Sequence, residues 1–539
     1  MSRRGSRPGL SGSVAGLSAV LLLSGCVGVS PTVPQIELGG DPNSDAVASP
    51  DVDARVRNAI GRVPALVADA LEQTGVPGLA VAIVHGDETV YAAGFGTKAA
   101  GTDEPIDAES VFQVASLSKS LTGTMIARAV SEGMVEWDTP VHELLPGFAL
   151  SDPYVTEHAT IADFMTHRSG LYTGAGDDLE SLGFDRDTIL DRLRLLPLDP
   201  FRSSYNYSNF GITTAGEAVA AAAGESWESL ISQELFEPLG MTSTSATHDG
   251  YLAEANRAEI NALVDGAFSA TQVRDADPES PAGGVSSNVV DLAEWMKLIL
   301  RDGELDGEPF ISPDALLPAV TPEQPSAAPA DPASRAGSYG YGFNVGVGPS
   351  GRTMLSHSGA FILGAGTNYR MIPSLDLGVV VLTNGTPTGV AEAIAADVTD
   401  LVQFGALTRD WLPAYAGLMA HYLDPAGDLV GQTRPADAAE PADLSDYAGE
   451  YVSDYFGRLT IAPSADGTGL TGVVRSEEGY ELGFEPWDGD TFALPLYNEE
   501  AAPGTLSSAE FRRGVTGEVA FLRIEVYDRW GLGTWHRIG

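Results

Sequence analysis

Strand patterns stand at both ends of residues 51–410, with helix patterns between them, and this arrangement limits what the chain can fold into. Near the first end, two apolar runs over residues 78–96 flank Gly86 and Asp87, which predicts a β-hairpin. Near the other end the sequence predicts four more strands, at residues 341–347, 353–358, 367–372 and 377–382. We therefore expect one α/β domain, of α+β type, whose sheet joins distant segments of the chain around an inserted helical region.

The last part of the chain follows a different pattern. Short strands alone are predicted there, at residues 449–452, 458–462, 470–474, 519–526 and 534–538. Residues 444–539 are therefore expected to form a small separate β domain, a barrel or a sandwich. Residues 411–443 in front of it are expected to be a linker, because residues 424–443 are polar and rich in Ala and Pro.

Residues 1–25 have the features of a lipoprotein signal peptide. A basic start precedes an apolar run over residues 14–23, which is too short to cross a hydrocarbon core of ~30 Å. The run ends at Leu23–Cys26, which resembles a bacterial lipobox, and the chain has no other cysteine than Cys26. We expect export and lipid anchoring of Cys26 at the cell membrane surface, with residues 26–50 as a flexible tether. An ordinary cleavable signal is the alternative, and the choice between inner and outer membrane stays open.

The charge of the 539-residue chain is strongly negative, with 30 Lys and Arg against 74 Asp and Glu and a formal charge of −44. Because phosphate contacts need clustered Lys and Arg, this balance argues against nucleic acid as a partner. We interpret the acidity as a well-solvated surface rather than as a sign of a cationic substrate.

Metal and nucleotide chemistry lack support in the sequence. The eight histidines include no pair at helical metal-ligand spacing, and neither an H-E-x-x-H motif nor a cysteine cluster occurs, so no metal is expected. One G-x-G-x-x-G match, at Gly346, Gly348 and Gly351, lies between two predicted strands and indicates a hairpin turn. Neither a phosphate-binding loop nor a G-x-S-x-G elbow is found, so we expect no cofactor and no α/β-hydrolase fold.

Ser116 and Lys119 form an S-x-x-K tetrad at the start of a predicted helix over residues 116–132. Residues three apart in a helix share a face, so the amine of Lys119 can reach Ser116 Oγ. A serine hydroxyl needs a neighbouring base to become a nucleophile, and a desolvated lysine can be that base. The helix N-terminus also favours a developing oxyanion. Taken alone, this spacing also arises by chance on helix surfaces.

Two further clusters accompany the tetrad. Tyr207-Ser208-Asn209 places a phenol, a candidate proton shuttle, beside a carboxamide that can anchor a substrate. His357 lies on a predicted strand that ends at Gly359, and a glycine there would let a substrate backbone lie along the strand edge. Taken singly, each cluster is more often structural: a core aromatic with a helix-capping Asn, and a buried histidine.

The three clusters together resemble, in type and order, the motifs of the serine β-lactamase and DD-peptidase superfamily, in its class C β-lactamase branch. Segments around them match as well, at residues 112–115, 165–171, 238–241, 282–287 and 379–384. The resemblance covers residues 55–400 and implies an antiparallel sheet flanked by helices. The segment from Tyr447 is similar to the small lipocalin-like β-barrel often appended to this family.

The resemblance also implies a role for each residue of the first two motifs. Ser116 would be the acylated nucleophile, and Lys119 and Tyr207 would share the base and acid work. Which of these two takes the first proton is left open. Asn209 would orient Lys119 and a substrate amide.

The third motif departs from the commonest pattern of the family. His357 stands where many relatives have lysine, near the substrate carboxylate or the leaving group. The resemblance places the oxyanion hole at the backbone N–H groups of Ser116 and Ala360, just after Gly359. A histidine is partly neutral at pH 7, so it would bind a penicillin carboxylate less reliably than lysine does.

The sequence thus predicts a surface-tethered serine hydrolase that acts on a small-molecule or peptide substrate, through amides of D-amino-acid peptides or through esters. A class C-type β-lactamase is one alternative. A catalytically silent lipoprotein that binds the cell wall or senses penicillin is the other. The oligomeric state and the role of the C-terminal domain stay open.

Overall fold

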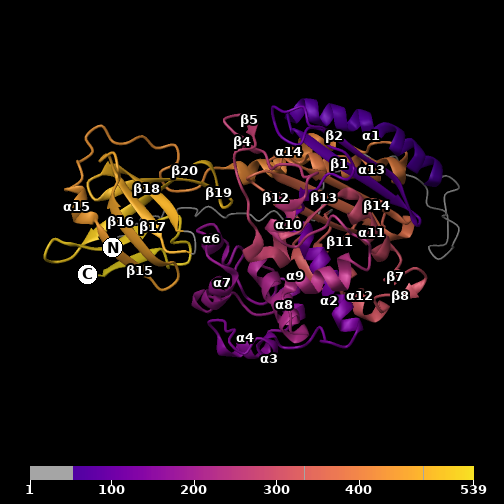
Figure 1. Ribbon diagram of the computed structural model, residues 1–539, viewed down its shortest axis with the longest axis horizontal. Coiled ribbons are helices and arrows are strands. Elements are labelled where there is room, and N and C mark those ends of the chain that lie inside the picture. The colour runs from indigo at the N-terminus through magenta and orange to yellow at the C-terminus, as the bar shows by residue number, and fades with distance from the viewer. Residues whose placement is uncertain (1–51, 333, 477–478, 539) are drawn as a thin grey trace, which may run out of the picture.

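The computed structural model describes residues 52–332, 334–476 and 479–538, which form a large α/β domain and a β-barrel beside it (Figure 1). The predicted signal peptide, the lipid site at Cys26 and the whole of the predicted tether, residues 26–50, lie outside the described residues. In the part that the structure describes, no helix has both the length and the apolar character needed to cross a membrane.

The large domain is built on an eight-stranded antiparallel sheet in the order β2-β1-β14-β13-β12-β11-β10-β9. Its strands are β1 (Gly78–His85), β2 (Glu88–Gly96), β9 (Gln324–Ala327), β10 (Gly337–Tyr339), β11 (Asn344–Val347), β12 (Thr353–Phe361), β13 (Ala365–Ile372) and β14 (Leu377–Thr383). Leu79 of β1 pairs with Thr383 of β14, so the two ends of the domain meet next to each other near one edge of the sheet. The expected sheet of distant segments is confirmed.

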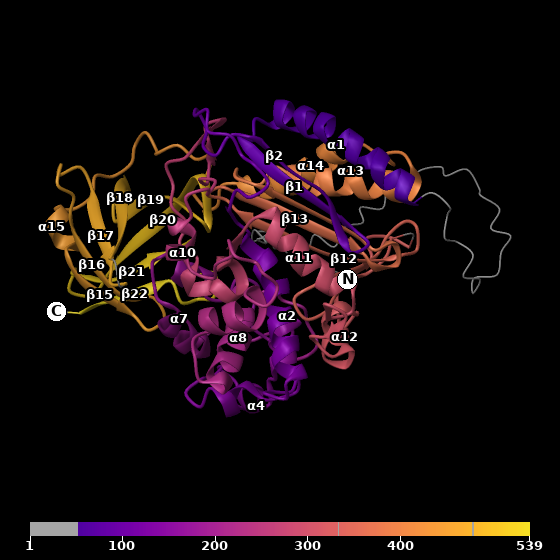
Figure 2. The ribbon, with the colours of Figure 1, turned by 45° about the vertical axis from the view of Figure 1, so that its right-hand side comes forward.

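Helices cover both faces of this sheet, which explains why β1 and β14 are apolar almost throughout (Figure 2). Val81 and Val381 pack with the helices α1 (Val52–Thr74) and α13 (Val390–Phe404) on one face. Ala82 and Val380 point to the other face, where α11 (Val289–Leu300) lies. Alternate residues of each strand therefore belong to two separate apolar cores.

The inserted helical region follows the first hairpin. Its helices are α2 (Ser118–Ser131), α3 (Val141–Leu144), α4 (Pro153–His158), α5 (Ile161–Met165), α6 (Asp177–Glu180), α7 (Arg186–Arg192), α8 (Asn209–Ala223), α9 (Trp227–Ile231), α10 (His248–Ala253) and, after α11, α12 (Pro313–Val320). Short 3₁₀ and π segments join them: η1 (Ala115–Leu117), η2 (Leu193–Leu195), η3 (Ser232–Phe236), η4 (Asp277–Glu279) and η5 (Ser280–Gly284), with η6 (Pro373–Leu375) between β13 and β14. Three small ribbons complete the domain: β3 (Phe112–Gln113) with β6 (Ser286–Ser287), β4 (Ala262–Val264) with β5 (Ala267–Ser269), and β7 (Glu304–Leu305) with β8 (Glu308–Pro309).

The segment expected to be a linker begins with helical structure instead. It forms α14 (Trp411–Met419) and η7 (Ala420–Leu423), and Tyr415 packs against Ala393 and Ala396 of α13. The aromatic and apolar residues of this stretch account for the packing. The connection between the two bodies therefore starts only after Leu423, and it leads to the short helix α15 (Leu444–Tyr447).

The C-terminal body is a closed antiparallel barrel, which the family resemblance implied and which the strand pattern allowed beside a sandwich. Its strands are β15 (Gly449–Ser453), β16 (Gly457–Pro463), β17 (Leu470–Val474), β18 (Tyr480–Asp488), β19 (Thr491–Asn498), β20 (Ala501–Arg513), β21 (Val519–Ile524) and β22 (Thr534–Ile538). Aromatic rings fill its interior: Tyr447 lies 4.9 Å from Phe511, and Phe456 lies 4.9 Å from Trp535, between ring centroids. The interior of the barrel is therefore filled by packed side chains.

Candidate active site

Ser116 lies in a sharp turn between a strand and a helix. Ala115 in front of it has a φ of +49°, in the left-handed region that a non-glycine residue adopts at an energetic cost. From Ser110 to Ala127, Ser116 is the one residue that is not buried. The predicted helix starts two residues later than expected, at Ser118, and Ser116 itself belongs to η1. The strained turn presents one hydroxyl within a stretch of chain that is otherwise buried.

Lys119 is fully buried on the first turn of α2, and its ammonium group has three partners. Its Nζ donates to Ser116 Oγ at 2.9 Å, to Asn209 Oδ1 at 2.7 Å and to the carbonyl of Ala282 at 2.9 Å. Burial lowers the pKa of Lys119 to about 8, although the nearby carboxylates Glu279 and Asp177 act in the opposite direction. The amine is thus held against the serine and brought close to its neutral form.

Tyr207 closes over the same lysine. Lys119 Nζ lies 4.6 Å from the centroid of the Tyr207 ring. Burial raises the pKa of the Tyr207 phenol well above its usual value, and a hydrogen bond to Ser116 opposes that shift. The phenol therefore keeps its proton at neutral pH. The structure brings Ser116, Lys119 and Tyr207 together, in the constellation that the motifs predicted.

Asn209 joins this group from the first turn of α8, where Ser208 caps the helix by accepting from the Gly211 N–H. The side chain of Asn209 accepts from Lys119 and donates to Asp177 Oδ2 at 3.3 Å. These two contacts fix the carboxamide, so that its oxygen faces the amine.

His357 lies in β12, is 3% exposed and uses both ring nitrogens inside the protein. Its Nδ1 lies 2.7 Å from the Ser358 carbonyl, which can only accept, so Nε2 accepts from the Tyr339 O–H at 2.9 Å. Burial, and next the charge of Lys119, lower the pKa of His357 to about 3. His357 is therefore neutral at physiological pH and offers no positive charge to a substrate carboxylate.

Packing requires a glycine at position 359, for a reason that the sequence did not reveal. A Cβ at this position would lie 2.3 Å from Thr367 Oγ1 and 2.4 Å from the Val114 carbonyl, both closer than real contacts allow. Glycine thus lets β12 pack directly against the turn that carries Ser116. Ala360 is the next residue of β12, and its place in the oxyanion hole with the Ser116 N–H stays a prediction.

Sequence reasoning missed two aromatic neighbours of the site, His167 and Tyr339. His167 Nδ1 accepts from the Ser208 N–H at 3.1 Å, and its ring lies 4.6 Å from Tyr207 and 5.0 Å from Tyr339, between centroids. Burial, and next the charge of Lys119, hold the pKa of His167 well below its usual value. Both residues come from segments far from the tetrad, and a short motif does not carry that signal.

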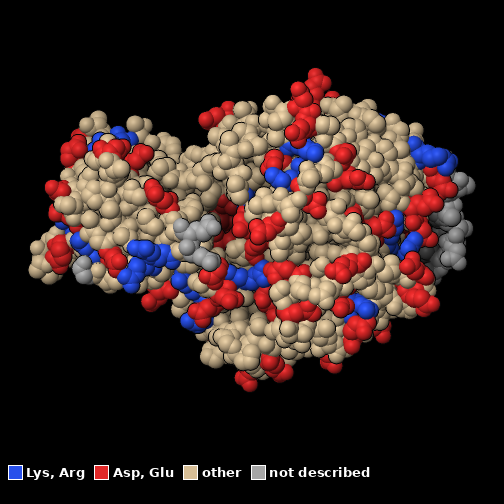
Figure 3. Space-filling view, in the orientation of Figure 1, with Lys and Arg blue, Asp and Glu red and all other residues tan. Residues whose placement is uncertain are grey.

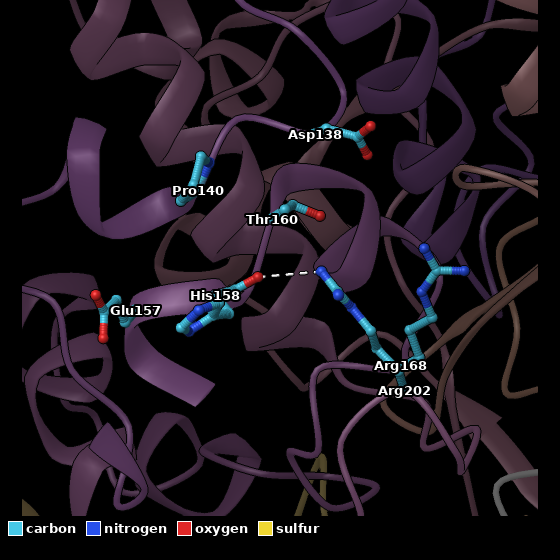
Figure 4. A pocket seen from close by; sticks show the side chains of 7 residues that line it. All are labelled: Asp138, Pro140, Glu157, His158, Thr160, Arg168 and Arg202. Atoms are coloured by element: carbon cyan, nitrogen blue, oxygen red, sulfur yellow. Dashed lines mark hydrogen bonds between the residues drawn. The ribbon is translucent and has the colours of Figure 1, made fainter. Parts of the chain in front are cut away.

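A separate cavity of about 620 Å³ lies away from these motifs (Figure 4). It is lined by Asp138, Pro140, Glu157, His158, Thr160, Arg168 and Arg202. Arg168 and Arg202 both pair with the buried Asp163, each at 2.7 Å. These two ion pairs therefore compensate the buried charge of Asp163. None of the motif residues lines this cavity.

Several known proteins are similar to this chain in sequence or in fold. A hydrolase of unguisins from Aspergillus violaceofuscus is 28% identical over 471 residues, which covers 80% of this chain and 82% of that protein. Penicillin-binding protein 4 of Amycolatopsis lactamdurans is 29% identical, with 70% of this chain and 93% of the relative covered. An octameric penicillin-binding protein homologue from Pyrococcus abyssi shares the fold, with a TM-score of 0.57 at 20% identity over 88% of this chain and 99% of that one.

The family assignment covers most of the large domain. Residues 63–404 match the Beta-lactamase family, which is more than half of the chain and includes all three motifs. With its antiparallel sheet, its inserted helices and its Ser-Lys-Tyr constellation, the chain belongs to the Beta-lactamase family and has the fold of the serine β-lactamases and DD-peptidases.

Proposed function

We propose that this protein is a serine hydrolase that forms an acyl-enzyme on Ser116 and cleaves amide bonds of D-amino-acid peptides or ester bonds. One observation carries the proposal: a buried amine with a lowered pKa lies 2.9 Å from the hydroxyl of Ser116. Membership in a family whose members act through such a serine supports it. Two further relatives, a D-alanyl-D-alanine-carboxypeptidase/endopeptidase of Escherichia coli and an esterase of Burkholderia gladioli, have activities that fit the same two bond types.

In acylation, Ser116 Oγ attacks the carbonyl carbon of the substrate while Lys119 Nζ takes the hydroxyl proton. The carbonyl oxygen becomes an oxyanion, for which we propose the backbone N–H groups of Ser116 and Ala360 as donors. Tyr207 keeps its proton, so its O–H is placed to protonate the leaving amine or alcohol as the bond to the carbonyl carbon breaks.

Deacylation reverses the roles. Acylation leaves Lys119 protonated and Tyr207 as a phenolate. Water then attacks the ester carbon of the acyl-enzyme and gives a proton to the Tyr207 oxygen, while Ser116 Oγ leaves and takes the proton of Lys119. The neutral His357 bears on the substrate class. It supplies no cation for the carboxylate of a β-lactam, so we rank a class C-type β-lactamase below a peptidase or esterase. A silent wall-binding protein is the second alternative, and the complete constellation counts against it.

A turnover panel tests the proposal. Wild-type protein should hydrolyse p-nitrophenyl acetate or a D-alanyl peptide, Ser116→Ala should not, and the exposed Ser151→Ala should behave as wild type. Turnover of nitrocefin at the rate of the other substrates would instead make it a β-lactamase. Lack of turnover of the whole panel, together with reversible penicillin binding, would favour the silent binder.

We further propose export and lipid anchoring at Cys26, on the strength of the lipobox-like Leu23–Cys26. Wild-type protein expressed in a bacterial host should then fractionate with membranes and carry the mass of a diacylglyceryl group. Cys26→Ala should lose both properties. A wild-type protein released without lipid would overturn this proposal and leave the catalytic one intact.

A further inference from the structure

His167 has a strained backbone next to the active site. It lies just after the end of α5 and has a φ of +57°, in the left-handed region that residues other than glycine adopt at an energetic cost. A helix end of this kind is usually made by glycine or asparagine, so it does not explain the imidazole. Strain of this kind persists where the surrounding structure holds the residue, and it is concentrated at functional sites.

The imidazole of His167 lies beneath the charged surface of the protein. Figure 3 shows charged side chains spread over one face of both bodies, whereas His167 is 2% exposed and its ring neighbours are aromatic. Its ring centroid lies 4.6 Å from that of Tyr207, 5.0 Å from that of Tyr339 and 5.4 Å from that of Tyr205. A side chain buried so deeply acts on a reaction only through a neighbour. Of these three, Tyr207 is the one that belongs to the Ser-Lys-Tyr constellation.

Two acceptors of His167 hold the segment that carries the second motif. The backbone carbonyl of His167 accepts from the Asn206 N–H at 2.9 Å, and its Nδ1 accepts from the Ser208 N–H at 3.1 Å. The Tyr207 carbonyl accepts from the Gly174 N–H at 3.1 Å. Both polar groups of the peptide unit between Tyr207 and Ser208 are therefore paired, and His167 is the partner of its N–H.

The bond to Ser208 also fixes the tautomer of His167. A backbone N–H can only donate, so Nδ1 accepts and the ring proton lies on Nε2. The lowered pKa of His167, caused by burial and next by the charge of Lys119, keeps the ring neutral and Nδ1 able to accept. Among the residues that the structure describes, Nε2 has no hydrogen-bond partner. The bond from Ser208 is thus the polar contact that a histidine makes here and an apolar residue would not.

The peptide unit that His167 holds links the two functional side chains of the second motif. Asn209 on one side is held further by α8 and by its bond to Asp177 at 3.3 Å. Tyr207 on the other side lies before the helix, and its phenol forms a hydrogen bond to Ser116. A shift of this peptide unit would therefore displace the phenol more than the carboxamide.

We propose that His167 is a positioning residue for the acid step of acylation: by accepting from the Ser208 N–H, its Nδ1 holds the phenol of Tyr207 where it protonates the leaving group. This inference rests on the proposed acyl transfer at Ser116. In that step the carbonyl carbon gains a bond to Ser116 Oγ and loses its bond to the leaving oxygen. The serine proton goes to Lys119, and the phenol proton goes to the leaving oxygen.

Two acetate esters make the acid step measurable. Phenyl acetate and p-nitrophenyl acetate form the same acetyl-enzyme and differ only in the leaving group. The p-nitrophenolate ion leaves readily without a proton, whereas the more basic phenolate depends more on protonation as its bond breaks. The ratio of kcat/KM for p-nitrophenyl acetate to kcat/KM for phenyl acetate therefore rises when the phenol of Tyr207 is displaced.

A matched pair of variants tests the role of Nδ1. Asparagine and leucine branch at the same atom, but only His167→Asn keeps an acceptor where Nδ1 stands, and His167→Leu loses it. We expect His167→Leu to raise the ratio about fivefold or more and His167→Asn to stay near wild type. His167→Gly also lacks the acceptor and adopts the left-handed φ without strain, so it should raise the ratio as well.

Asp302→Leu is the control for backbone strain. Asp302 has a φ of +53°, is exposed and lies in the turn after α11, outside the site. Leucine there has a similar backbone cost, and the variant should keep the wild-type ratio. Since both esters are measured on the same folded molecules, a smaller folded fraction lowers both rates alike and leaves the ratio unchanged.

The outcomes separate this inference from the proposed function. A wild-type ratio in both His167→Leu and His167→Gly would make His167 purely structural and overturn the inference. A ratio raised equally in His167→Asn would show that the acceptor does not matter, and would overturn it too. In both cases the hydrolase stands if Ser116→Ala abolishes ester turnover. Turnover of neither ester by wild type, with Ser116 unlabelled by a fluorophosphonate, would overturn the proposed function and this inference with it.

Discussion

Lys119 donates to three acceptors, and two of them decide what its amine can do. The carbonyl oxygens of Asn209 and Ala282 can only accept, so they hold two N–H groups of Lys119 in place. When the amine is neutral, its lone pair is therefore left facing Ser116 Oγ. Together with the phenol of Tyr207, which keeps its proton, this arrangement favours Lys119 over Tyr207 as the first base.

The pH dependence of acylation follows from this arrangement. The pKa of Lys119 is about 8, so at lower pH the amine is protonated and cannot accept a proton. We therefore expect kcat/KM to rise with pH and to level off above about pH 8. Initial rates with p-nitrophenyl acetate, corrected for spontaneous hydrolysis, measure it. Lys119→Met should be slower than wild type by about 10²–10⁴-fold. Lys297→Met, which loses a pair with Glu294 on α11, is the control. A rate that is flat across this range in wild type would exclude lysine as the base.

At the scale of elements, the site is the junction of β12 with the turn before α2. The local part of it could be predicted, because Ser116 and Lys119 are one helical turn apart and spacing alone brings them together. The contacts of Tyr339 and His167 could not, since they are formed by segments that only the sheet and the inserted helices bring close.

The same contrast holds for the barrel strands. β15 to β17, β21 and β22 were predicted, whereas β18, β19 and β20 were not. Pro486, Pro495 and the Pro503-Gly504 pair interrupt their apolar patterns, and proline is expected to break a strand. In the barrel these strands are held by pairing on both sides, which tertiary structure provides and local sequence does not show.

Gly359→Ala tests the junction directly. The added Cβ would collide with the Val114 carbonyl, so the turn before Ser116 must shift. We expect a loss of about 1–3 kcal/mol in stability and a larger proportional loss in kcat/KM. Gly346→Ala on β11 is the matched control, because its nearest neighbour would lie 4.0 Å away. Denaturant unfolding and esterase rates report the two effects, and equal behaviour of both variants would contradict this account of the junction.

At the scale of the whole molecule, buried carboxyl groups are an unusual feature of both bodies and of the contact between them. Burial raises the pKa of Glu279, Glu392 and Glu499 to about 7 and that of Glu180 to about 8. Unfolded glutamates titrate near pH ~4.3. Between these values the folded protein holds more protons than the unfolded chain, so the free energy of unfolding falls as pH rises.

Thermal unfolding should show this effect between about pH 6.5 and about pH 8. The buried His167 and His357 act in the opposite direction there, because they are neutral in the folded protein and still partly protonated in the unfolded chain, but they are two groups against four glutamates. We expect Tm to fall as pH rises, and the fall to be shallower in Glu392→Gln, which is 2% exposed. Glu481→Gln should keep the wild-type slope. A Tm that stays level or rises with pH would show that these groups are ionised in the folded state.

The covalent intermediate is the central claim, and peptide mapping by mass spectrometry tests it most directly. Wild-type protein is treated with a fluorophosphonate probe, digested and mapped. The account predicts one adduct, on Ser116, formed slowly in Lys119→Met and absent in Ser116→Ala. An adduct on another serine, or none under conditions that label a penicillin-binding protein, would contradict it.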